Sequence, residues 1–238
     1  MSHNNVKQQI EDGQVIVRTL AQDLRIAQSS WANWEAINGE DEALRQNFRD
    51  ASGWLWLTPN ALVGALARDT LMALSRIVDK SGKSSLSEIA SLLNGKKRGP
   101  SPKSDLITRA HQLGAAEEKL VQAKIQFFTD RVPAQWHKSQ SPPIPDLYNW
   151  RPQIEELRDK ALAHSDTSIN LNKIQINQIR NGFDLISPLV TAAHHIFVGS
   201  PLPGNTMKQL TKSANDFWNY AQIGFIEAFE KDRVRSKN

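Results

Sequence analysis

The sequence contains no cysteine, so neither disulfides nor thiolate zinc sites can form, and no cysteine nucleophile is available. This absence is typical of proteins that work in a reducing cytosol. No window approaches the roughly 18 consecutive apolar residues that a membrane span requires. The opening MSHNNVKQQIEDGQ also lacks the apolar stretch of a signal peptide. We therefore expect a soluble, cytoplasmic protein that does not interact with membranes.

Several common catalytic signatures are also missing. The chain has no glycine-rich phosphate loop, no HExxH zinc motif and no GxSxG elbow, which excludes the familiar NTPases, metalloproteases and hydrolases. We accordingly expect neither a cofactor nor a metal ion. Positive charge is in small excess, because 29 Lys and Arg stand against 25 Asp and Glu, giving +4. This excess permits an anionic partner without requiring one.

The long segments all show the helical period of 3.6 residues, and no strand-like alternation extends beyond a few residues. The pattern predicts an all-α fold. Two helices are expected between Val6 and Arg49, and a third should start with Thr58 as N-cap and Pro59 at the first helical position. The capping box Ser85-Leu86-Ser87-Glu88 predicts a short helix that stops at Asn94-Gly95. Further helices are expected at Asp105–Thr129, Asp146–His164, Asn172–Val198 with a bend at Pro188, and Met207–Arg233.

Two charged residues interrupt the apolar face of the helix expected over 60–80. Asp69 and Arg76 fall on the stripe that the apolar residues of this segment form at 100° per residue. Charged groups on a buried face need partners. We therefore interpret them as a buried ion pair within or between helices, with support of a nearby functional site as the alternative.

The segment 154–166 contains the most informative charged residues. Ile154, Leu157 and Ala161 share one face of a helix, and Arg158 and His164 lie on either side of that face. A histidine can exchange a proton near neutral pH, and an arginine can hold a phosphate through two hydrogen bonds. The pair suits metal-independent cleavage of an RNA phosphodiester. The alternative is an ordinary helix end, with Arg158 paired to a neighbouring glutamate and His164 near the C-terminal dipole.

The sequence LRDKALAHSD resembles the signature of the HEPN superfamily, specifically its abortive-infection AbiU-like branch. That signature is an arginine, a polar residue and, about four to six residues after the arginine, a histidine. Arg158, Asp159 and His164 match these positions, and Ser165 and Asp166 supply the polar residues that follow. The segments ARDTL at 67–71, ALSRIVD at 73–79 and SSLS at 84–87 resemble the same branch. The resemblance covers about 58–198.

The resemblance implies an antiparallel helical bundle over residues 58–198. A helical extension over 1–57 would precede it, and a C-terminal helix over 199–238 would pack on it. It also implies a homodimer in which two Arg158–His164 pairs form one composite site that cuts RNA, in antiphage defence or as a toxin. An antitoxin or another regulatory protein is a further implied partner. Two alternatives stay open: a catalytically inactive module that binds nucleic acid or a partner protein, and a purely structural helical dimer.

Other candidate groups favour ordinary structural roles. The basic loop Lys96-Lys97-Arg98 could contact RNA phosphates, but short solvated basic loops are common. His194 and His195 point about 100° apart on a helix, which favours buried, hydrogen-bonded histidines over a metal site. A second Arg-His spacing, at Arg131 and His137, falls in a proline-rich crossing over 133–145 and is attributed to chance. The tryptophans at 31, 34, 54 and 56 are expected in the core or a dimer interface rather than stacked on bases.

Overall fold

The computed structural model describes residues 3–38, 53–79, 82–95, 100–132, 145–163, 171, 173–202 and 207–235. The regular structure within these ranges is entirely α-helical, which confirms the predicted all-α class. The helices are α1 (His3–Asn38), α3 (Gly53–Ile77), α4 (Leu86–Leu93), α5 (Lys103–Leu113), α6 (Ala115–Thr129), α7 (Pro145–Ala163), α8 (Lys173–Val198) and α9 (Met207–Arg235). None of them combines the length and apolar character needed to cross a bilayer.

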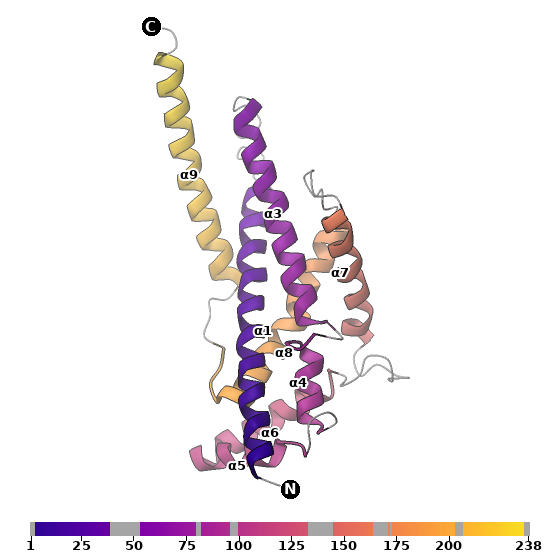
Figure 1. Cartoon of the computed structure of the whole chain (residues 1–238). Coiled ribbons are helices and arrows are strands. Elements are labelled where there is room, and N and C mark those ends of the chain that lie inside the picture. Colours follow the sequence, from indigo (N-terminus) through magenta and orange to yellow (C-terminus); the bar gives the residue numbers. More distant parts are fainter. Residues whose placement is uncertain are drawn as a thin grey trace.

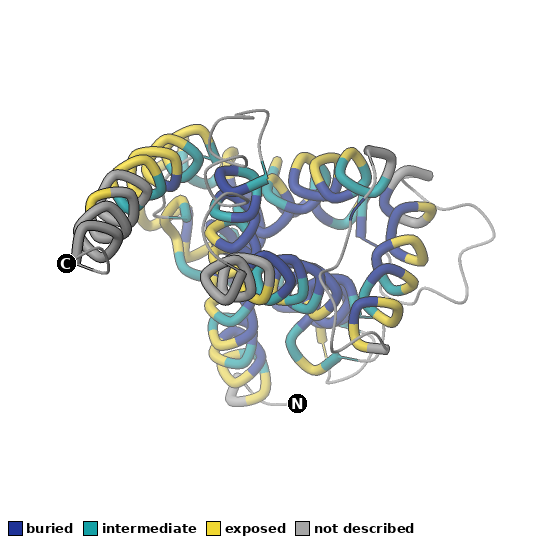
Figure 2. The backbone as a smooth tube through the Cα atoms, turned by 90° about the horizontal axis from the view of Figure 1, so that it is seen from above, coloured by how far each residue is buried: buried dark blue, intermediate teal, exposed yellow. Residues whose placement is uncertain are grey.

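Helix α1 is the axis around which the other helices are arranged (Figure 1). It packs against α3, α8 and α9, while α7 packs against α3 and α8. The short helices α5 and α6 lie together at the lower end of α1, and α9 extends beyond its upper end (Figure 1). Buried residues line the inward sides of the helices, whereas exposed residues follow the helix that leads to the C-terminus (Figure 2).

The buried face of α1 agrees with the spacing of its apolar residues in the sequence. Val17, Leu20, Leu24 and Trp31 recur at intervals of three, four and seven residues and are almost completely buried. The Trp31 ring stacks on that of Trp34 with centroids 4.7 Å apart, and both rings are buried, which confirms their predicted place in the core. The side chains of the tryptophans at 54 and 56 lie outside the described residues.

The capping box predicted before α4 is confirmed. The Ser85 hydroxyl accepts a hydrogen bond from the backbone N–H of Glu88, and the helix begins at the next residue, Leu86. At the other end Asn94 is the C-cap, and Gly95 has a φ of 65°, the left-handed conformation that glycine adopts without steric cost. This helix is therefore delimited at both ends by local interactions.

Two helix boundaries differ from the predictions. Helix α3 begins at Gly53 instead of Thr58, so Pro59 lies inside it. A helix can include a proline because proline fixes a helical φ and removes only its own amide donor. Pro152 and Pro188 also lie inside helices. The single helix predicted over 105–129 is divided into α5 and α6 by Gly114, whose φ of 131° is not helical. The predicted helix after α1 and the proline-rich crossing fall on 39–52 and 133–144, outside the described residues.

Helix α1 contacts several of the helices that follow it in sequence, and α9 packs on α1. The core formed by α3, α7 and α8 also includes apolar residues of α1. Helix α9 packs on α1, where the Trp218 indole donates a hydrogen bond to Asn33 over 3.0 Å. The division into an extension, a bundle and a C-terminal helix, with boundaries at 57 and 198, stays a prediction.

Candidate functional site on helix α7

The buried face of α7 is the one predicted from the sequence. Ile154, Leu157 and Ala161 are buried against the core. Trp150, one turn earlier, is also buried, and its indole N–H donates to the backbone oxygen of Gln178 on α8 over 2.6 Å. Together these contacts fix α7 against α8.

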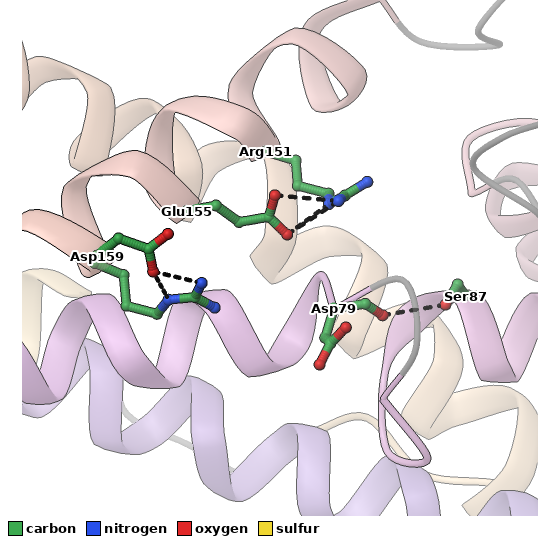
Figure 3. A network of polar contacts seen from close by, with 6 residues as sticks. Asp79, Ser87, Arg151, Glu155 and Asp159 are labelled. Atoms are coloured by element: carbon green, nitrogen blue, oxygen red, sulfur yellow. Dashed lines mark hydrogen bonds and ion pairs between the residues drawn. The ribbon is translucent and has the colours of Figure 1, made fainter. Parts of the chain in front are cut away.

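A row of charged side chains lies beside this buried face, on the side of α7 toward α3; we call it the charged edge. It consists of Arg151, Glu155, Arg158 and Asp159. The Arg151 guanidinium donates to Glu155 over 3.0 and 3.1 Å, and that of Arg158 donates to Asp159 over 2.6 and 2.8 Å. Figure 3 shows both pairs above the ribbon of α3. Two cations and two anions make the net charge of this edge zero.

Arg158 occupies the rim of the α7 packing face. Its side chain is 31% exposed, so the guanidinium is neither buried nor fully solvated. Its partner is the adjacent Asp159 and not the glutamates considered from the sequence. Those are already engaged, because Glu155 binds Arg151 and Glu156 binds Lys160 over 2.5 Å. Arg158 thus remains close to solvent, and among the described residues its partner is a carboxylate that is itself largely exposed.

The residues that follow Arg158 in the family signature are outside the described part of the chain. Helix α7 ends at Ala163, and His164, Ser165 and Asp166 come directly after it. The same holds for His137 and for the basic loop Lys96-Lys97-Arg98. Of the residues that match the signature, the structure therefore describes Arg158 and Asp159, which are bonded to each other.

Asp69 and Arg76 do not form the predicted buried pair. Arg76 instead donates to Asp23 on α1, with its Nη2 and Nε 2.7 and 3.0 Å from the same carboxylate oxygen. Asp69 is exposed. The predicted place of Asp69 and Arg76 on the buried face is wrong. Thr70 and Leu74 are part of that face, so its centre lies away from the two charged residues. These two residues are thus at the border of α3 that faces α1 or solvent.

The two adjacent histidines are buried and hydrogen-bonded, as interpreted from the sequence. His194 contacts the backbone oxygen of Ser200 through Nδ1 over 2.9 Å, and His195 contacts Glu117 on α6 through Nε2 over 2.5 Å. Throughout the described ranges, no group of three histidine, aspartate or glutamate side chains is placed to hold a metal ion.

The charged edge also contains residues that the sequence analysis missed. The spacing of Arg151 and Glu155, four residues apart on a helix, is a known signal for an ion pair and could have identified them. No comparable signal exists for Asp79, which lies outside the charged edge, just beyond the end of α3, and is level with Arg151 in the view of Figure 3. Its position relative to α7 depends on how two helices distant in sequence pack together.

Comparison with protein-family models, with curated proteins and with solved structures finds no match to this chain. The residues of α7 and their surroundings are therefore the basis for a functional proposal. Chemically, a rim arginine held by one exposed carboxylate can exchange that carboxylate for a phosphate, because both present oxygen atoms to the two donors of the guanidinium.

Proposed function

We propose that this protein is a metal-independent endoribonuclease of the HEPN type, a cytoplasmic protein of antiphage defence or a toxin, with Arg158 and His164 as its catalytic pair. The observation that carries the proposal is the position of Arg158. Its guanidinium lies at the rim of α7, close to solvent, on the helix whose last residue immediately precedes His164. A guanidinium that can bind a phosphate therefore lies in the last turns of α7, and His164 is the next residue in sequence after that helix.

In the proposed reaction, the ribose 2′-hydroxyl attacks the adjacent phosphorus and the bond to the 5′-oxygen of the next nucleotide breaks. His164 takes the proton from the hydroxyl or gives a proton to the leaving oxygen. Arg158 binds the phosphate oxygens, on which negative charge increases in the transition state. Asp159 holds the Arg158 guanidinium in place before RNA binds.

A homodimer is part of the proposal, because a single histidine cannot take and give a proton in the same step. Two copies of the pair, facing one cleft, supply one histidine for each transfer. The lack of cysteine permits a direct test. His164→Cys, as the only thiol in each copy, is expected to give a covalent dimer on mild oxidation. Gln112→Cys, exposed on α5, is the matched control and should form no covalent dimer. Cross-linking of the control alone would contradict a shared site.

The cleavage test uses labelled RNA in the presence of EDTA. Wild type is expected to cut it, whereas Arg158→Ala and His164→Ala should each lower the rate by about 100-fold or more. Lys160→Ala is the matched control, since it removes a positive charge from the opposite side of α7, where Lys160 binds Glu156. Equal rates in all four proteins would exclude the assignment.

A second candidate is a non-catalytic module that binds nucleic acid or a partner protein, including an antitoxin, through the same surface. It is favoured by the charge balance of the charged edge, where each guanidinium already has a carboxylate partner. A neutral surface of paired charges suits a protein partner as well as RNA. This candidate predicts that wild type cuts no RNA and that Arg158→Ala weakens binding.

A further inference from the structure

Helices α3 and α7 are antiparallel neighbours, which determines the residues of α3 that lie near the end of α7. Figure 1 shows α3 running down from its N-terminal end and α7 running up from its own. In the view of Figure 3, Asp79, just beyond the end of α3, is level with Arg151 in the first half of α7. Residues earlier in the sequence of α3 are therefore level with residues later in the sequence of α7.

This register places Arg68 level with the end of α7. Arg68 precedes Asp79 by eleven residues, and Leu162 follows Arg151 by eleven residues. Along α7, eleven residues cover about 16 Å at 1.5 Å per residue. Along α3, the nine residues from Arg68 to Ile77 cover about 13 Å, and Asp79 follows two residues beyond the end of the helix. Arg68 is therefore level with Leu162, immediately before the segment that begins with His164. Arg68 is therefore about one helical turn beyond Arg158, measured toward the C-terminal end of α7.

Arg68 is also on the side of α3 that borders α7. Around the helix axis it lies about 40° from Met72 but about 80° from Arg76, which binds α1. Arg68 is half-buried, as are Met72 and Asp79 along the same border of α3. Because α3 packs against α7 on one side and α1 on another, this border faces α7.

Arg68 has no ion pair or hydrogen bond with any residue that the structure describes. It therefore differs from Arg151 and Arg158, whose charges are balanced by Glu155 and Asp159. Asp79 lies along the same border, so the three arginines and three carboxylates named here sum to zero charge. What Arg68 adds is a guanidinium that can bind a phosphate without breaking an ion pair to a described residue, and contacts between cations and phosphates supply most of the affinity for RNA.

We infer that Arg68 is a second phosphate-binding residue of the RNA site, contacting a phosphate next to the one that Arg158 holds. The inference rests on the proposed function and adds a residue from another helix. The two guanidinium groups are on helices that pack about 8–10 Å apart and differ by about 6 Å in height. A single strand that follows the junction of α3 and α7 contacts both.

The experiment measures binding separately from cleavage. The probe is a fluorescein-labelled 2′-O-methyl RNA, which binds but cannot be cut because its 2′-oxygens are blocked. Fluorescence anisotropy gives its Kd at several salt concentrations for wild type, Arg68→Ala, Arg68→Lys and Arg109→Ala. Arg109, exposed on α5 at the far end of the molecule, is the charge-matched control (Figure 1).

We expect Arg68→Ala to weaken binding about tenfold and to lower the salt slope by about 0.7, the contribution of one phosphate contact on a single strand. Arg68→Lys should keep the slope and lose less affinity, since it keeps the charge but not the two-pronged geometry. Arg109→Ala should bind like wild type. The thermal midpoints of Arg68→Ala and Arg109→Ala should agree, which separates a binding role from a structural one.

Two results would overturn the inference: equal Kd values for Arg68→Ala and Arg109→Ala, or no binding of the probe by wild type. If wild type cuts RNA and Arg68→Ala binds normally, the ribonuclease stands and the role of Arg68 fails. If the probe binds through Arg68 but no RNA is cut, the phosphate contact stands and the ribonuclease fails.

Discussion

Arg76 on α3 and Asp23 on α1 form the ion pair that joins the two most extensively packed helices. Two nitrogens of the guanidinium donate to one carboxylate oxygen, at 2.7 and 3.0 Å. The exposure of the partners is unequal, 10% for Asp23 and 48% for Arg76. The carboxylate therefore has little contact with water and depends on the arginine for its hydrogen bonds.

Removing this arginine should destabilise the fold. Arg76→Ala leaves Asp23 nearly buried and without its cation, so we expect the free energy of unfolding to fall by about 1–3 kcal/mol. Urea unfolding followed by tryptophan fluorescence measures the change. Arg180→Ala is the control, because it breaks a more exposed pair with Glu35, also on α1, and should cost less than about 1 kcal/mol. Equal losses in the two variants would contradict the importance of burial.

A second buried contact, between His195 on α8 and Glu117 on α6, should also be needed for stability. Glu117→Ala leaves a buried imidazole nitrogen without its partner, and we expect a loss of about 1–3 kcal/mol. Glu117→Gln keeps an oxygen acceptor and should lose less. The neighbouring Glu118 binds the exposed His111, so Glu118→Ala is a matched control with little expected effect. Thermal unfolding of the three variants would show whether this order holds.

Features determined by a few consecutive residues could be predicted from the sequence. The cap of α4 depends on Ser85 and Glu88, three residues apart, and the buried face of α7 depends on the period that relates Ile154 to Ala161. Both predictions are confirmed. The predicted start of α3 is wrong because Thr58-Pro59 is a common helix start that this chain does not use.

Contacts between distant parts of the chain could not be predicted in the same way. Asp23 and Arg76 are 53 residues apart, and nothing in either segment indicates the other. The helical wheel of α3 alone could place Arg76 near a buried face but could not identify the helix packed there. The same limit applies to Arg68, whose position relative to α7 follows only from the packing of the two helices.

Gly114 should tolerate substitution less well than Gly95. Gly95 has a φ of 65°, in the left-handed region that asparagine also adopts, so Gly95→Asn should change stability little. Gly114 has φ 131° and ψ 159°, a conformation almost confined to glycine. Although a side chain there would meet no neighbouring atom, Gly114→Asn is expected to cost about 1–3 kcal/mol. Urea unfolding of the two variants measures both costs, and at Gly114 the cost comes from backbone conformation because a Cβ there meets no neighbouring atom. An equal cost at both sites would refute the prediction.

The contact between Gly182 and Trp150 should link stability to the proposed activity. A Cβ on Gly182 would lie 2.1 Å from Cζ2 of the buried indole, far inside contact distance. Gly182→Ala must therefore displace Trp150, weaken its hydrogen bond to Gln178 and shift α7, at a cost of about 1–3 kcal/mol. Because α7 presents Arg158, RNA cleavage should decrease at temperatures where the variant is still folded.

A double-mutant cycle separates this steric effect from general damage. Trp150→Leu alone removes the ring and leaves a cavity, which should also destabilise the protein. In the double variant the new methyl group occupies part of that cavity, so the total loss should be smaller than the sum of the single losses. Additive losses would show that Gly182 and Trp150 do not act through their contact. Since neither residue is on the charged edge, recovery of cleavage along with stability would show that the position of α7 supports the reaction.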